Sequence, residues 1–298
     1  MITNRARLFI FGMATLILGS TSVFAQRQLG KKQGPTSKLY IAEAKGDTQI
    51  QSVDKIYTAR QATAFDAPGT AIETKENAHN AFVYSNGTGV FIDQNTRLEI
   101  ARFVQEPFTP ARNDRVDAAS EPSISQSDVF VSHGAVGVCT NLLVSGSSMN
   151  YGTPQAAVTI RGGKLSLETN ANETIVDLLE GDVTVRGGGR DSGGQILRPG
   201  ERAIIRRASA GQPARISISP TPPDLLPVLD ERVTIACNAK KTVTFEVIRK
   251  KALAGLEASG VATMDDSDED LQEIQARPTV PQQLPYNVVV SPSMLAGG

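Results

Sequence analysis

Apolar residues recur two positions apart in short runs between Leu39 and about Pro220, and these runs do not hold the 3.6-residue period of a helix. This alternation is typical of strands that bury one face. We therefore predict an all-β architecture for this part of the chain. The pairs that carry the pattern are Val90 and Ile92, Leu98 and Ile100, Val158 and Ile160, Leu165 and Leu167, Val176 and Leu178, Val183 and Val185, and Ile216 and Ile218.

Glycine-containing turn signals separate these runs at intervals of roughly a dozen residues. A weak internal similarity joins residues 43–50 to residues 179–185, because a Gly-Asp step precedes a strand pattern in both. Such similarity indicates a rolled or solenoid-like stack of short strands, with a β-sandwich as the alternative. The predicted turn residues are Gly46, Gly87, Gly162, Gly181 and Gly200.

The character of the chain changes after the predicted β-domain, residues 39–218. Residues 219–231 are proline-rich and predict a linker or extended strap. In the C-terminal extension, residues 232–260, we expect two more strands ending near Ile248 and then a short helix from about Glu246 to Ser259, all packed on the β-domain. Residues 261–298 carry an acidic run and scattered prolines, so we expect a disordered tail.

The N-terminus has the pattern of an export signal. Arg5 and Arg7 precede an apolar run of 11 residues and a small-residue stretch that ends at Ala25. The run is shorter than the roughly 20 residues that a membrane-spanning helix needs. We therefore predict a signal peptide at residues 1–25, a flexible leader at 26–38, and no membrane span after cleavage.

Charge and cysteine content narrow the classes further. The net charge is −1, loss of Arg5 and Arg7 takes it to −3, and no basic stripe with interleaved aromatics points to nucleic acid. Cys139 and Cys237 both lie in the exported part, so they are a candidate disulfide, with two free thiols as the alternative. Two histidines and two cysteines stand at no recognised metal-ligand spacing, and we predict no metal or cofactor.

One stretch resembles a catalytic motif. GGGRDSGGQIL, residues 187–197, contains the Asp-Ser-Gly-Gly that surrounds the nucleophilic serine of trypsin-like proteases. Neither His79 nor His133 stands in that family's histidine motif, and Arg190 and Gln195 replace its glycine and proline. A glycine-rich hairpin loop accounts for the same residues.

A carboxylate-based glycan hydrolase has equally little support. Asp93, Glu99 and Glu180 occur on or beside predicted strands, but no motif pairs them. We therefore predict that the protein is not an enzyme, and we keep a hydrolase that uses Ser192 or these carboxylates as the alternative.

The order of elements resembles the FecR-type domain family over roughly residues 40–206. A threonine-ended strand at residues 71–74 is followed by residues 81–89 with a glycine turn and by the "threonine, x, leucine" strand at 93–100. The later part is similar in Thr153–Gly163, Val176–Val185 and Leu197–Ala203. The stretch at 106–128, with three prolines, is read as a loop insertion between the two halves, with a binding arm as the alternative.

The resemblance implies an exported all-β module of Gram-negative bacteria, best known as the periplasmic part of regulators that sense an iron-transport receptor and restrain a sigma factor. Those regulators carry a cytoplasmic domain and a membrane helix, whereas this chain begins with a cleavable signal pattern. We therefore do not expect direct sigma-factor control. The leading hypothesis is a non-catalytic binding or scaffold module in the periplasm or cell envelope, with an envelope protein or glycan as partner and an accessory role in envelope signalling. A secreted hydrolase and a structural envelope component are the alternatives.

Overall fold

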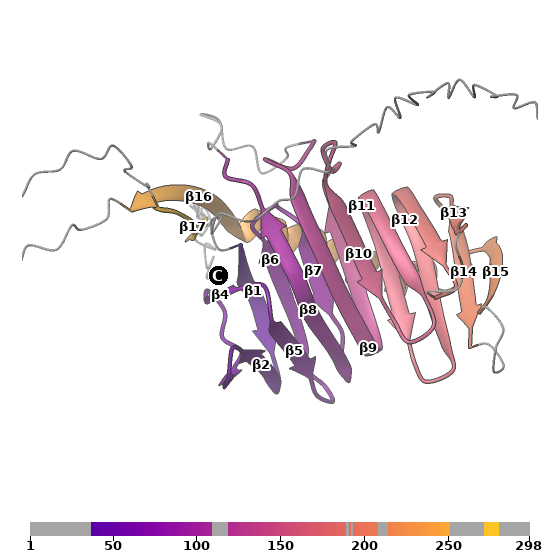
Figure 1. Ribbon diagram of the computed structural model, residues 1–298. Coiled ribbons are helices and arrows are strands. Elements are labelled where there is room, and N and C mark those ends of the chain that lie inside the picture. Colours follow the sequence, from indigo (N-terminus) through magenta and orange to yellow (C-terminus); the bar gives the residue numbers. More distant parts are fainter. Residues whose placement is uncertain are drawn as a thin grey trace, which may run out of the picture.

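The computed structural model describes most of the chain after residue 36 (Figure 1). The predicted signal peptide, most of the predicted leader, and Ser192 lie outside the described residues. No helix in the described part is long and apolar enough to cross a membrane. The described ranges are 37–108, 119–188, 191, 193–207, 214–250 and 271–279, with 246–250 and 271–274 described for the backbone alone.

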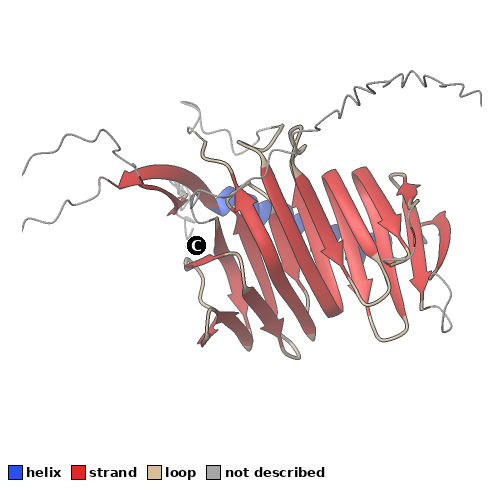
Figure 2. Ribbon diagram, viewed as in Figure 1, coloured by secondary structure: helices blue, strands red, loops and turns tan. Residues whose placement is uncertain are grey.

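Strands dominate the described chain, as Figure 2 shows. One sheet runs from Lys38 to Pro220, and its strands are β1 (Lys38–Lys45), β2 (Thr48–Ser52), β3 (Lys55–Thr58), β4 (Ala64–Asp66), β5 (Thr70–Thr74), β6 (His79–Tyr84), β7 (Gly89–Ile92), β8 (Thr96–Gln105), β9 (Ser125–Thr140), β10 (Ser148–Gly152), β11 (Ala157–Thr169), β12 (Glu173–Arg186), β13 (Gln195–Leu197), β14 (Glu201–Arg206) and β15 (Arg215–Pro220).

The sheet is rolled into two layers because its longest strands pass from one layer to the other. The first part of β9 pairs with β8 and β10, whereas Gly134–Thr140 pairs with β7 and β11. The strands β11 and β12 divide in the same way. The first layer thus follows the order β4-β1-β6-β7-β9-β11-β12-β14-β15, and the second follows β3-β2-β5-β8-β9-β10-β11-β12-β13. The predicted rolled all-β fold is confirmed, and the roll is not a closed barrel.

The inner faces of the two layers enclose the main core. Alternate residues of the strands point into it, as the period-two pattern predicts. Tyr84 and Tyr151 are wholly buried there, and neither hydroxyl has a hydrogen-bond partner among the described residues. Burial raises the pKa of both phenols.

A helix covers the outer face of the first layer. The helix α1 (Leu226–Ala239), which has a proline in its first turn, packs on β6, β7, β9 and β11. A Cβ added to Gly89 would lie 2.0 Å from the carbonyl oxygen of Ala236, so the helix backbone approaches the sheet where the side chain is missing. A second apolar cluster fills this interface, formed by Tyr40, Ala42, Ala81, Val83, Phe91, Cys139, Ala236, Ala239 and Val243.

The C-terminal predictions need correction. Residues 226–239 form a helix instead of a linker and a strand, because Leu229, Val233 and Ala236 bury one helical stripe on the sheet. The helix expected from Glu246 is also wrong where it can be checked, since β16 (Val243–Lys250) covers those residues and 251–259 lie outside the described part. The tail expected to be disordered contains β17 (Leu271–Pro278), which pairs with β16.

Two other boundaries differ from the predictions. The insertion expected at 106–128 ends earlier, because β9 begins at Ser125 and pairs there with Gln105. Gly46, Gly87 and Gly200 lie in turns between strands, as predicted, with φ of 72°, 84° and 83°. Gly162 and Gly181 instead lie inside β11 and β12, where those strands bend between layers.

Candidate functional site

At the bends of β11 and β12, glycines bring the backbones of the two strands close together. Gly163 takes φ of 122° and Gly181 takes φ of 102°. A Cβ on Gly163 would lie 2.0 Å from the Glu180 carbonyl oxygen, and a Cβ on Gly181 would lie 2.0 Å from the Gly162 carbonyl oxygen. Only glycine allows this approach of the two backbones. The bend therefore forms a bare backbone floor.

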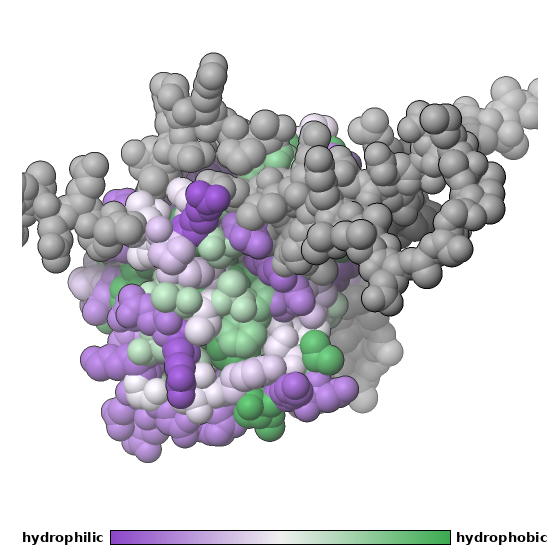
Figure 3. Space-filling view, turned by 90° about the vertical axis from the view of Figure 1, so that its left-hand side faces the viewer, coloured by the Kyte–Doolittle hydropathy of each residue, from purple (hydrophilic) through white to green (hydrophobic). Residues whose placement is uncertain are grey.

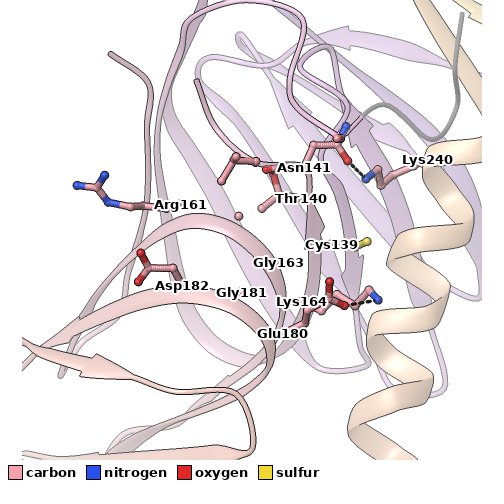
Figure 4. A pocket seen from close by; sticks show the side chains of 13 residues that line it. Cys139, Thr140, Asn141, Arg161, Gly163, Lys164, Glu180, Gly181, Asp182 and Lys240 are labelled. Atoms are coloured by element: carbon pink, nitrogen blue, oxygen red, sulfur yellow. Dashed lines mark hydrogen bonds and ion pairs between the residues drawn. The ribbon is translucent and has the colours of Figure 1, made fainter. Parts of the chain in front are cut away.

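A groove of about 630 Å³ lies over this floor, and we call it the bend groove (Figure 4). Its volume falls in the range typical of ligand sites, about 300 to 1,000 Å³. Polar and charged side chains surround it. The residues that line it are Ala119, Cys139, Thr140, Asn141, Leu142, Arg161, Gly162, Gly163, Lys164, Glu180, Gly181, Asp182 and Lys240.

The charges on the helix side of the groove are engaged. The Lys164 Nζ lies 2.6 Å from the Glu180 Oε2, and the Lys240 Nζ donates to the Asn141 Oδ1 (Figure 4). On the opposite side stand Arg161 and Asp182, both exposed. Neither takes part in the ion pairs found within the described part of the chain. Arg161 can therefore donate hydrogen bonds to a ligand, and Asp182 can accept them, without first breaking an ion pair.

The wall that carries Asn141 and Leu142 is anchored from below. Glu121 is buried, and its carboxylate accepts hydrogen bonds from the Ser125 hydroxyl at 2.5 Å and the Val144 N–H at 2.9 Å. The Leu142 N–H donates to the Ala119 carbonyl at 3.1 Å. A buried carboxylate that is fully hydrogen-bonded fixes its neighbours, because the loss of one partner leaves a desolvated group unsatisfied. This wall is therefore preorganised.

The disulfide fixes the helix side of the groove. Cys139 lies in the lining and is bonded to Cys237 of α1, with an S–S distance of 2.09 Å. The bond joins the two cysteines that the sequence offers as a candidate pair. Because Lys240 follows α1 directly, the bond also holds this lysine at the groove.

The aspartate of the protease-like motif forms hydrogen bonds within its own loop. The Asp191 carboxylate accepts hydrogen bonds from the backbone N–H groups of Gly187, Gly193 and Gly194 at 3.0 to 3.1 Å. These hydrogen bonds lower the pKa of Asp191, and the bond from Gly187 contributes most. The structure says nothing of Ser192, which lies outside the described residues.

The two histidines lie on different strands, and each contacts a different polar side chain. The His79 Nε2 lies 2.9 Å from the Glu43 Oε1, and the His133 Nδ1 lies 3.1 Å from the Ser132 hydroxyl. His79 belongs to β6, whereas His133 belongs to β9. Each imidazole therefore has a different polar neighbour.

The three carboxylates of the hydrolase alternative have separate surroundings. Asp93 accepts a hydrogen bond from the Arg232 Nε at 3.0 Å, Glu180 pairs with Lys164, and Glu99 is exposed on β8. Over the described ranges, no group of three or more His, Cys, Asp or Glu side chains is placed to hold a metal.

Sequence reasoning missed the charged residues of the groove. Arg161 and Asp182 flank glycines in two triplets that predicted plain turns, Arg161-Gly162-Gly163 and Glu180-Gly181-Asp182. The signal was present as a charge beside each glycine. Its meaning depends on the pairing of β11 with β12, which sets Gly162 opposite Asp182.

Comparisons with known proteins give a limited result. No family model matches the chain, and no curated protein matches it. Two crystal structures of a candidate anti-sigma factor from Parabacteroides distasonis are similar, with TM-scores of 0.38 and 0.37 and identities of 15% and 14%. Each match covers 53% of this chain and 62% of the neighbour, so the chain spans less than two thirds of the length of these neighbours.

Proposed function

We propose that this chain is an exported, non-catalytic binding module of the cell envelope that holds a partner protein in the bend groove. The observation that carries the proposal is the groove itself, a bare glycine floor between anchored walls with Arg161 and Asp182 available for hydrogen bonds. Its most specific form is an accessory role in envelope signalling, which the FecR-type resemblance implies.

The lining favours a protein segment over a glycan as the ligand. Charges of both signs surround the floor, with Arg161, Lys164 and Lys240 against Glu180 and Asp182. Complementary charges of both signs are common on polypeptides and give an interface its specificity. The bare backbone floor also offers close approach to a second backbone.

Export is supported by the N-terminal pattern and by the cysteine pair. Disulfides persist in oxidising compartments and are rare in the cytosol. The bond between Cys139 and Cys237 joins α1 to the roll, so a chain folded in this way is suited to the periplasm or the cell surface. The Asp191 and histidine contacts favour a non-catalytic role, because the groups that a serine hydrolase would use are engaged elsewhere.

Site-specific photo-crosslinking in intact cells tests the binding role. A photoreactive residue in place of Asp182 should give a discrete protein adduct, and Arg161→Ala should reduce its yield severalfold. The same residue in place of Glu99, an exposed acid on β8, is the matched control. Equal adducts at both positions, or none at Asp182, would contradict the proposal.

Thiol trapping tests export. The full chain should carry oxidised cysteines in the periplasmic fraction, whereas a chain without residues 1–25 should stay in the cytosol with reduced cysteines. Oxidised cysteines in the truncated chain would remove this support. Peptide or ester hydrolysis that is lost in Ser192→Ala would favour the hydrolase instead.

A further inference from the structure

The strand β3 forms an exposed edge at one end of the roll. Within the described part of the chain, β3 pairs with β2 alone, and all four of its residues are exposed. Ile56 is 70% exposed, Tyr57 is 41% exposed, and Val53 in the preceding turn is 77% exposed. Figure 3 views the molecule from this end and shows apolar side chains gathered among charged ones. Exposed apolar edge strands invite pairing with another chain.

The register of β3 shows which of its backbone groups point outward. The Ala59 N–H donates to the Thr48 carbonyl oxygen at 2.8 Å, and Ile50 stands opposite Tyr57. Hydrogen-bonded and non-hydrogen-bonded pairs alternate in an antiparallel ladder. The backbone N–H and C=O groups of Tyr57 therefore form hydrogen bonds to β2. Those of Ile56 and Thr58 point away from β2, toward the open edge.

The turn before β3 holds a strained residue at its tip. Val53 takes φ of 55°, in the left-handed region that β-branched residues avoid. Its side chain is exposed, so its contacts within the roll do not compensate for this conformation. Strained residues of this kind cluster at functional positions. An apolar side chain displayed in this way is consistent with an interaction surface.

The edge is complementary to itself. If two β3 strands pair antiparallel about a two-fold axis at Tyr57, the outward groups of Ile56 in one copy meet those of Thr58 in the other. Continued past the ends of β3, the same register brings Asp54 of one copy, in the turn before the strand, near Arg60 of the other, and both residues are exposed. The contact thus combines backbone hydrogen bonds, apolar side chains and opposite charges.

We propose that a second copy of this chain binds at β3 and joins the two sheets into one across a two-fold axis. The interface does not include the bend groove, so it is independent of the proposed function. Because β3 is only four residues long, the buried area falls at the low end of specific interfaces, and the association is weak and concentration-dependent.

Crosslinking through single cysteines tests the register. Facing residues of a non-hydrogen-bonded pair have Cα atoms about 4.5 Å apart, which suits a disulfide. Tyr57→Cys should therefore form a covalent dimer under mild oxidation. Lys55→Cys is the control, because this exposed neighbour stands opposite Ala59 and far from its own copy. Equal crosslinking of the two variants, or none of Tyr57→Cys, overturns the proposal.

Charge reversal with sedimentation tests the same contact without a new bond. Asp54→Arg and Arg60→Asp should each weaken self-association by about tenfold, since each disrupts both symmetry-related pairs. An equimolar mixture of the two variants should regain it, because the mixed dimer restores both pairs. Arg161→Ala in the groove should leave it unchanged. A wild-type chain that stays monomeric at about 100 µM, or a mixture that does not recover, overturns the proposal.

Discussion

The two layers of the roll differ in what lies on their outer faces. Beneath α1, the first layer is apolar outside as well as inside, with Tyr40, Val83 and Phe91 facing the helix. The second layer exposes polar residues outside, among them Gln49, Gln51 and Glu99. Strands that are covered on both faces have continuous apolar runs, and strands that are covered on one face alternate. The burial of β6, in which Asn80–Tyr84 are all buried, and of β2, which alternates, follows this rule.

Glycine has opposite consequences in two places of this fold. At Gly89 and Gly137 the missing side chain is replaced by the backbone of α1, and a Cβ on Gly137 would lie 2.6 Å from the Arg232 carbonyl oxygen. At Gly163 and Gly181 the missing side chains allow the paired backbones of β11 and β12 to come close together where they bend, and both glycines line the bend groove. A glycine therefore marks a close approach, and the surrounding elements decide whether a site results.

The largest expected effect concerns the bond that keeps α1 on the first layer. The double variant Cys139→Ala, Cys237→Ala opens a loop with a sequence separation of 98 residues. Loss of such a closure costs about 4 to 5 kcal/mol of unfolding free energy in the chain-entropy model. Urea unfolding measures this loss, and limited proteolysis should then cut α1 before the roll. Unchanged unfolding and proteolysis would show that the bond does not hold the helix.

A steric change at the same interface should have the next largest effect. Gly89→Ala places a Cβ against the backbone of Ala236, and we expect a loss of about 2 to 3 kcal/mol on thermal or urea unfolding. Gly152→Ala is the matched control, because its Cβ would lie 3.4 Å from the Phe130 Cδ2 in the second layer. Equal losses in both variants would mean that the helix approach is not what Gly89 provides.

Removing an ion pair should change the unfolding free energy by less than these two changes, and by different amounts on the two faces. Arg232 on α1 is 15% exposed and pairs with Asp93, so Arg232→Ala should cost about 1 kcal/mol of unfolding free energy. Arg97 on β8 is 36% exposed and pairs with Glu73, and Arg97→Ala should cost a few tenths at most, roughly the value of exposed pairs. Urea unfolding of the two variants side by side makes the comparison. A larger loss for Arg97 would reverse the ranking of the faces.

The smallest effect is a pH dependence on the second layer. A hydrogen bond from Lys75, and then one from Arg97, lowers the pKa of Glu73 below its ordinary 4.5, against desolvation. Because the folded pKa is the lower one, the stabilisation is present above about pH 4.5 and is lost as the pH falls through the folded pKa. Glu73→Gln should therefore lower stability slightly at pH 6 and not at pH 3. The difference between variant and wild type in urea unfolding at the two pH values measures it.

The β-part was predictable because its signal is local. Pairs such as Val90 and Ile92 or Val176 and Leu178 alternate along the chain, and all four residues lie in the core. The C-terminal part was mispredicted because Val233, Thr234 and Ile235 favour strands locally. The apolar outer face of the first layer outweighs that preference, since a helix buries Leu229, Val233 and Ala236 on it together.

The candidate site could be predicted only in part. The sequence singled out Cys139 and Cys237 as a candidate disulfide, and Gly162 and Gly181 as turn residues. Cys139, Gly162 and Gly181 line the groove, and Cys237 is bonded to Cys139. The sequence did not identify Arg161, Asp182 or Lys240 as neighbours. Lys240 reaches the groove because the disulfide and the packing of α1 bring a residue distant in sequence to the end of β9.

The sequence by itself determined the strand period, the turns at Gly46, Gly87 and Gly200, and the pair of cysteines available for a bond. These features depend on the backbone and on residues close together along the chain. The tertiary structure decided that β11 and β12 bend between layers, that α1 covers one face, and that charges from distant segments surround one groove. Those outcomes depend on which surfaces bury one another, and that free energy arises only when distant segments meet.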